Sequence, residues 1–96
     1  MGTHPPPAED PVTVRVLHID DDARFAELVT TYLSQNGMAV THALDGGRGL
    51  AALESGSFDV VLLDVMMPGM DGLEVCRRIR ARRNVPVLML TARGDE

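Results

Sequence analysis

The stretch from Phe58 to Gly72 places the strongest constraint on how this 96-residue chain folds. It contains four consecutive apolar residues, Val60 to Leu63, followed directly by Asp64. An apolar run this short, without polar alternation, is typical of a strand buried on both faces of a parallel sheet. In such sheets the ligand crevice lies outside the carboxyl ends of the strands. Asp64 is therefore expected at a functional site.

The composition fits one small globular domain, because 45% of the residues are hydrophobic and can form a core. No apolar run approaches the roughly 18 residues of a membrane span, and the first residues lack the pattern of a secretory signal. We therefore expect a cytoplasmic protein without membrane association. A net charge of −5 argues against nucleic-acid binding by the whole surface. The single cysteine, Cys76, excludes an internal disulfide.

The order of elements predicts an α/β fold. Residues 1–11 carry four of the six prolines without periodicity, so we interpret them as a disordered leader before a domain over 12–96. Strands are expected over 12–19, 38–43, 60–63 and 85–90, with a helix in each interval. With right-handed crossovers, this β-α-β-α-β-α-β order gives a parallel sheet with helices on both faces.

Aspartates mark the helix starts. Asp22 suits an N-cap better than a ligand, and Gly37 suits the end of that helix, which carries apolar residues at helical spacing. Asp45 precedes a helix that we expect to be the weakest, because three glycines in or beside its first turn each cost up to about 1 kcal/mol relative to alanine. Asp71 and Glu74 resemble a capping box, with Val75, Cys76 and Ile79 on the buried face.

Two strand ends carry the acids that suggest chemistry. Asp20 and Asp21 follow the strand ending at Ile19, and Asp64 follows Leu63. If these strands are neighbours, the three carboxylates converge in one crevice, where a proton or a hard cation must relieve their repulsion. Oxygen ligands with open positions suit Mg²⁺. A carboxylate beside such a cation can attack phosphorus and form an aspartyl phosphate.

Three segments in order, Ile19 to Asp22, Leu62 to Gly72 and Val85 to Ala92, resemble the receiver domain of two-component response regulators. The resemblance runs from about Val14 to Glu96 and implies a flavodoxin-like doubly wound sheet. The sequence from Met89 to Gly94 is most similar to that of transcription regulators with a winged-helix DNA-binding output domain.

The resemblance also implies roles for individual residues. Asp64 would accept the phosphoryl group from a sensor histidine kinase. Asp21, Asp64 and the Met66 backbone carbonyl would bind Mg²⁺, and Asp20 would act mainly through bound water. Thr91 would be the switch hydroxyl that hydrogen-bonds the phosphoryl group and draws its loop inward.

A complete receiver continues with a fifth strand that ends in a lysine and carries an aromatic switch residue, and with two more helices. None of these is in the 96 residues, whose nine basic side chains are all arginine. We therefore expect an incomplete receiver in which phosphorylation is slow or absent. Its open fourth strand is expected to favour a homodimer or other edge-to-edge association. DNA would be contacted only through an output domain that these residues do not contain.

Other interpretations stay open at this point. A phosphohydrolase of the haloacid-dehalogenase type also uses a strand-end aspartate and Mg²⁺, but it needs an aspartate two residues later, where this chain has Met66. A non-phosphorylated docking module is the other alternative. His18 is interpreted as a core histidine and Cys76 as a core residue. The arginines between Arg77 and Arg83 are interpreted as a solvated face rather than a nucleic-acid patch.

Overall fold

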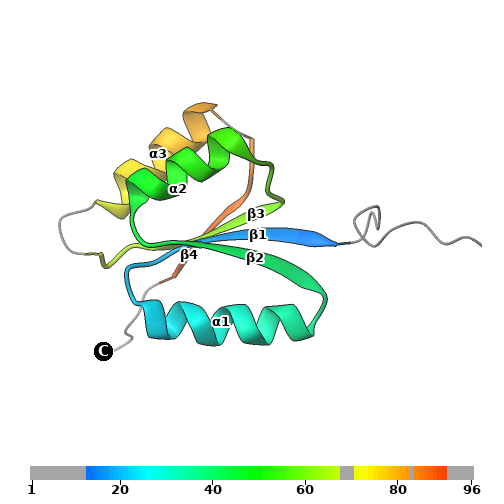
Figure 1. Ribbon diagram of the computed structural model, residues 1–96. Helices are drawn as coiled ribbons and strands as arrows, with labels where there is room; N and C mark the ends of the chain where they lie inside the picture. Colours follow the sequence, from blue (N-terminus) through cyan, green and yellow to red (C-terminus); the bar gives the residue numbers. More distant parts are fainter. Residues whose placement is uncertain (1–12, 68–70, 83, 91–96) are drawn as a thin grey trace, which may run out of the picture.

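The computed structural model of the chain describes residues 13–67, 71–82 and 84–90. The strands are β1 (Val14–Ile19), β2 (Met38–Ala43), β3 (Val60–Asp64) and β4 (Val87–Leu90). They pair in parallel in the order β2-β1-β3-β4, as Figure 1 shows. The predicted parallel α/β sheet is confirmed, and strand order reverses between β1 and β3. The predicted leader over 1–11 and Thr91 lie outside the described residues.

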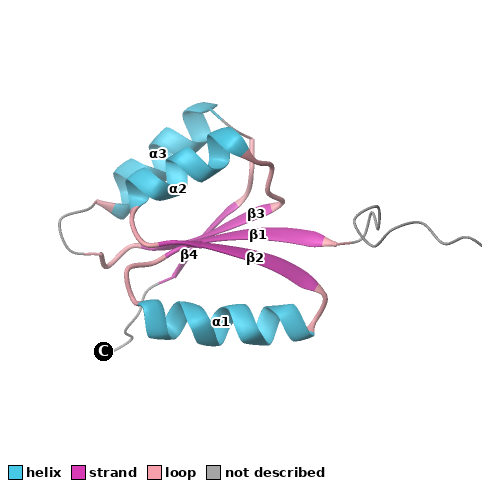
Figure 2. Cartoon of the chain, in the orientation of Figure 1, coloured by secondary structure: helices cyan, strands magenta, loops and turns pink. Residues whose placement is uncertain are grey.

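Helices cover both faces of the sheet. These are α1 (Ala23–Gln35), α2 (Gly46–Ser55) and α3 (Gly72–Arg82). Figure 2 shows α1 on one face and α2 with α3 on the other. No helix in the described part of the chain is long and apolar enough to cross a membrane.

The predicted helix caps are largely confirmed. Asp22 Oδ1 accepts a hydrogen bond from the Phe25 amide, and Asp45 Oδ1 accepts one from the Arg48 amide. Gly37 follows α1 with a φ of +84°, a conformation that favours glycine. These contacts satisfy amides that a helix start otherwise leaves without partners.

The capping box predicted for α3 forms only in part. Asp71 Oδ1 accepts a hydrogen bond from the Leu73 amide, as a cap does. Glu74 instead accepts hydrogen bonds from the Arg77 and Arg78 side chains. The carboxylate pairs instead with two arginines one turn further along the helix, as the i, i+3 and i, i+4 spacings allow.

The main core lies between the sheet and the pair α2 and α3. It is formed by ten buried residues: Leu17, Ile19, Ala43, Leu53, Val61, Leu63, Met67, Val75, Cys76 and Ile79. The buried face predicted for α3 is therefore confirmed, as is the interpretation of Cys76 as a core residue. The single helix α1 covers less of its face, since Leu28 and Tyr32 are 68% and 65% exposed despite their helical spacing.

One glycine of α2 is required by close packing beneath the crevice. A Cβ atom on Gly49 would lie 2.4 Å from Cδ1 of Ile19, the last residue of β1. The neighbouring Gly47 has no such restriction, because a Cβ there would meet only Asp45 Oδ1 at 3.5 Å. One of the glycines that we expect to weaken this helix thus lets it lie directly against the end of β1.

Candidate functional site: an acidic crevice at the carboxyl end of the sheet

The acidic crevice is formed where β1 and β3 end side by side. Ile19 and Leu63 are partners in the parallel register of these strands. Asp20 and Asp64 therefore leave the sheet at the same edge. One carboxylate oxygen from each of Asp20, Asp21 and Asp64 lies within 4.8 Å of the others. The convergence predicted from the sequence is confirmed for all three residues.

Asp20 is held rigidly although it lies just beyond a strand. Its amide donates to the Ala43 carbonyl at 3.0 Å, which ties its backbone to β2. Its Oδ1 accepts a hydrogen bond from the Asp22 amide at 2.9 Å, and the residue is only 3% exposed. The chain thus fixes both the backbone and one carboxylate oxygen at the base of the crevice.

Asp64 and Asp21 complete the cluster in different environments. Asp64 is 6% exposed, and its Oδ1 accepts a hydrogen bond from the Met66 amide at 2.9 Å. Asp21 is exposed to solvent. The cluster therefore combines two buried carboxylates with one that is exposed to solvent.

Charge in this crevice is unfavourable without a counterion. Burial raises the pKa of Asp20 above its ordinary value, the hydrogen bond from the Asp22 amide opposes this, and the charge of Asp64 adds to it. A hard divalent cation would relieve the same repulsion. The donor set fits Mg²⁺, because it consists of carboxylate oxygens with one side open to water.

Two histidines lie close to Asp20, and neither was predicted to belong to the site. His18 is fully buried, and its Nε2 lies 3.2 Å from Asp20 Oδ2. The geometry is not that of a hydrogen bond, so neither ring nitrogen of His18 has a partner in the described part of the chain. His42 Nε2 lies 2.7 Å from the Asp20 carbonyl oxygen. A signal was available, since residues i and i+2 of a strand share one face.

Of the remaining predicted site residues, the structure describes Met66 but not Thr91. Met66 is placed beside Asp64 through its amide, and its side chain is 58% exposed. Its carbonyl as a ligand stays a prediction. Met67 is buried in the core. Thr91, the predicted switch hydroxyl, lies outside the described residues.

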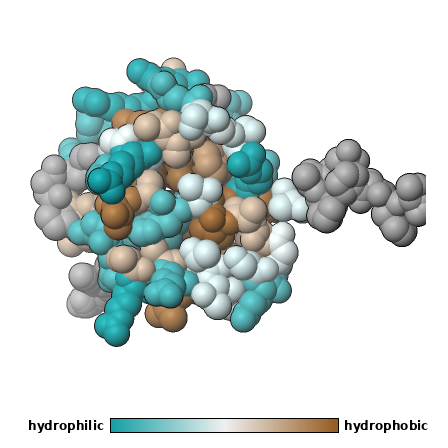
Figure 3. All heavy atoms as spheres, viewed as in Figure 1, coloured by the Kyte–Doolittle hydropathy of each residue, from teal (hydrophilic) through white to brown (hydrophobic). Residues whose placement is uncertain are grey.

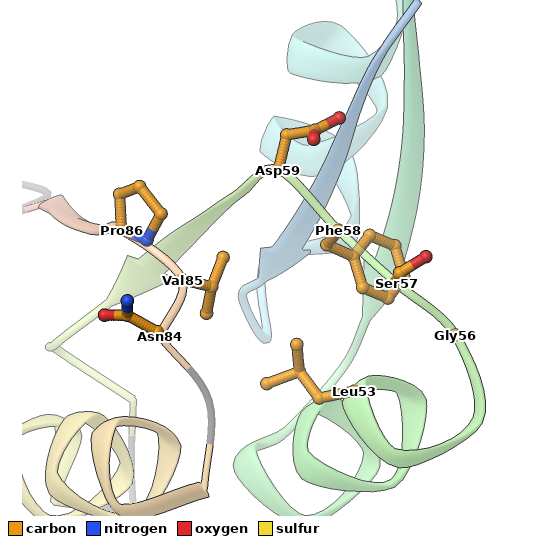
Figure 4. Close-up of a pocket in the computed structure, with 8 residues that line it drawn as sticks. All are labelled: Leu53, Gly56, Ser57, Phe58, Asp59, Asn84, Val85 and Pro86. Carbon is orange, nitrogen blue, oxygen red and sulfur yellow. The ribbon is translucent and has the colours of Figure 1, made fainter. Parts of the chain in front are cut away.

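A pocket at the opposite end of the sheet offers less chemistry. It has a volume of about 310 Å³ and is lined by eight residues, shown in Figure 4: Leu53, Gly56, Ser57, Phe58, Asp59, Asn84, Val85 and Pro86. Asp59 is its only acid, and that carboxylate accepts a hydrogen bond from the Arg15 amide. The acidic crevice therefore remains the candidate functional site.

The acids converge where strand order reverses in a doubly wound parallel sheet, which is the usual place for a ligand site in such folds. The family model of the response regulator receiver domain matches residues 16–96. The chain belongs to this family.

Individual relatives agree with this assignment. The chain is 43% identical over 82 residues to the transcriptional regulatory protein ResD of Bacillus subtilis, covering 85% of this chain and 34% of ResD. It is 46% identical over 82 residues to the transcriptional regulatory protein TcrA of Mycobacterium tuberculosis, covering 84% and 32% of the two chains. The chain thus spans about one third of the length of these relatives.

Solved structures share the fold. The crystal structure of the response regulator TrrA of Thermotoga maritima with Mg²⁺-BeF matches with a TM-score of 0.80 and 35% identity, over 85% of this chain and 72% of that chain. A crystal structure of the histidine kinase ThkA in complex with TrrA matches with a TM-score of 0.79 and 34% identity, over 86% and 72% of the chains.

Proposed function

We propose that Asp64 is the phospho-acceptor of this receiver domain and that a sensor histidine kinase supplies the phosphoryl group. The observation that carries the proposal is the convergence of three carboxylate oxygens within 4.8 Å at the switch in strand order. The solved complex of ThkA with TrrA supports a kinase partner by analogy. The transcriptional relatives support control of transcription through an output domain elsewhere in a longer protein. We place this function in the cytoplasm.

The proposed reaction needs little from the protein beyond position and charge. The Met66 amide holds one oxygen of Asp64, and the other oxygen attacks the phosphorus of a phosphohistidine. The P–N bond breaks, and its electron pair stays on the imidazole nitrogen, which takes up a proton. Water later cleaves the aspartyl phosphate, which restores the carboxylate and releases phosphate. The domain would therefore turn over its own phosphoryl group without acting on a separate substrate.

Asp20, Asp21, Asp64 and the Met66 carbonyl would hold Mg²⁺ in this proposal. The fit rests on the oxygen donor set and on the raised pKa of Asp20, which is caused first by burial and further by the charge of Asp64. When bound, Mg²⁺ neutralises charge on the transferred phosphoryl group. Thr91 remains our proposed switch hydroxyl.

The test is the intact mass of the protein before and after incubation with Mg²⁺ and acetyl phosphate. The expected result is a single phosphoryl adduct that forms slowly, because no lysine contributes to the site. Asp64→Asn is expected to abolish the adduct. An adduct retained in Asp64→Asn would contradict the assignment of the acceptor. Complete absence of an adduct in the unsubstituted chain would favour a non-phosphorylated docking module.

We also propose that the chain self-associates through the edge at β4. In the described part of the chain β4 pairs only with β3. Leu88 is 56% and Met89 is 40% exposed, and alternation along the strand puts them on opposite faces of the sheet. Elsewhere, on the face viewed in Figure 3, hydrophilic side chains separate the apolar surface into patches. An exposed apolar edge recruits a second strand.

The oligomeric state in solution tests this second proposal. Light scattering with size-exclusion chromatography is expected to show a dimer that Leu88→Glu converts to a monomer. Leu73→Glu is the matched control, because Leu73 is 63% exposed but lies on α3, away from the β4 edge. A monomer at high concentration in the unsubstituted chain would contradict edge association.

A further inference from the structure

His18 is a buried polar side chain that the proposed phosphoryl transfer does not use. It is 0% exposed, and neither ring nitrogen has a hydrogen-bond partner in the described residues. Buried polar groups in folded proteins are nearly always paired, so an unpaired one requires a physical reason. The close contact between its Nε2 and Asp20 Oδ2, at 3.2 Å, supplies that reason.

The His18 ring is surrounded mainly by other side-chain rings. The edge of the ring meets Phe25, with centroids 5.9 Å apart, and His42 lies at 5.8 Å. A neutral imidazole carries a single N–H, on one of its two ring nitrogens. Of the two ring nitrogens, Nε2 is the one that lies near a carboxylate oxygen, at 3.2 Å from Asp20 Oδ2.

The geometry points to His18 as a positioning residue for Asp20, acting through the approach of its Nε2 to Oδ2 at 3.2 Å. This inference rests on the cation site of the proposed function. The Asp22 amide holds Oδ1, and the Nε2 of His18 lies 3.2 Å from Oδ2, so each oxygen of the carboxylate has a neighbour that limits its rotation. His42 holds the backbone carbonyl of the same residue at 2.7 Å. His18 and His42 are register partners in β1 and β2, so Asp20 is contacted by a histidine from each of two adjacent strands.

A residue that contacts a metal ligand in this way influences how well the ligand is oriented toward the metal. Residues that hydrogen-bond to metal ligands typically change metal affinity 10- to 100-fold when they are replaced. We therefore expect His18→Leu, which removes the donor and keeps the ring site filled, to weaken Mg²⁺ binding by about tenfold. His18→Gln places an amide nitrogen at the same reach along the side chain and is expected to restore much of the affinity.

Nuclear magnetic resonance on the full 96-residue chain tests the inference in two ways. Long-range ¹H–¹⁵N spectra without metal identify which nitrogen of His18 carries the proton, and we expect Nε2–H. A titration with Mg²⁺ alone, followed through amide shifts, gives the affinity of each variant. Val16→Ala is the matched control, because Val16 is an apolar residue that is 2% exposed and lies two residues before His18 on the same face of β1. It lowers stability and is expected to leave Mg²⁺ affinity unchanged.

The outcomes separate this inference from the proposed function. An Nδ1–H tautomer would overturn the positioning role whether or not Mg²⁺ binds. Unchanged affinity in His18→Leu would also overturn it, and so would equal losses in His18→Leu and Val16→Ala. If no variant responds to Mg²⁺, the proposed cation site is wrong, and the tautomer still decides whether His18 supports Asp20.

Discussion

The acids at the two ends of the sheet differ in their burial and in their contacts. At the amino end Asp59 is exposed, its Oδ2 accepts a hydrogen bond from the Arg15 amide at 2.8 Å, and its own amide donates to the Arg15 carbonyl at 2.7 Å. The Arg15 guanidinium lies 5.3 Å from the centroid of the Phe58 ring. At the carboxyl end Asp20 and Asp64 are buried close together. The acid at the amino end is thus exposed to solvent, whereas those at the carboxyl end are buried together.

This contrast explains how a small domain combines a stable fold with a reactive site. Carboxylates that repel one another and a histidine without a good hydrogen bond lower the stability of the carboxyl end. Functional sites often keep such unfavourable arrangements because ligand binding relieves them. The hydrophobic core and the contacts at the amino end stabilise the same sheet. They therefore offset the stability lost at the carboxyl end.

The largest expected effect comes from disturbing the support beneath the carboxyl end. Gly49→Ala would place a Cβ 2.4 Å from Ile19 Cδ1 and is expected to lower the free energy of unfolding by about 1–3 kcal/mol. Gly47→Ala, two residues earlier in α2, is expected to raise it by up to about 1 kcal/mol, because alanine favours the helix and has room. Urea unfolding of both variants measures the difference. Equal effects would show that Gly49 is not restricted by packing.

Acid is expected to destabilise the carboxyl end through His18. Its pKa is lowered by burial in the folded protein, so the unfolded chain binds the proton more readily. Stability should therefore fall as the pH drops below about 6.5, with a slope of up to about 1.4 kcal/mol per pH unit. Urea unfolding between pH 7.5 and 5.5 measures this slope. His18→Leu should flatten it, and an unchanged slope in that variant would assign the titration to another group.

A smaller effect is expected at the amino end. Asp59→Ala removes the acceptor for the Arg15 amide and should lower the free energy of unfolding by about 0.5–1.5 kcal/mol. Asp59→Asn retains an acceptor oxygen and should lose less. Thermal unfolding of the pair provides the measurement. A gain in stability in Asp59→Ala would remove the contrast between the two ends.

Much of this architecture could be predicted from sequence because local signals agreed with the global fold. The apolar run before Asp64 indicated a central strand, and two acidic strand ends indicated the crevice. The pairing of Glu74 with Arg77 and Arg78 could not be assigned, since a capping box and an ion pair compete for the same carboxylate. Burial of the apolar residues of α1 also depended on tertiary coverage, which periodicity does not supply.

The role of the histidines illustrates a different limit. His18 was correctly predicted to be buried, and its spacing from Asp20 placed both on one face of a strand. Periodicity alone does not give the rotation of either side chain, so the 3.2 Å contact required the structure. His42 reaches Asp20 from β2, and the register that brings it there is a property of strand pairing.

The most direct test of the central claim is the stability of Asp64→Asn with and without Mg²⁺. Removing one buried charge is expected to raise the free energy of unfolding without metal by on the order of 1 kcal/mol. Saturating Mg²⁺ should stabilise the unsubstituted protein and leave Asp64→Asn nearly unchanged, because ligands stabilise only the state they bind. Asp59→Asn should retain the response to Mg²⁺. Loss of stability in Asp64→Asn without metal, together with equal responses to Mg²⁺ in all three proteins, would contradict the account.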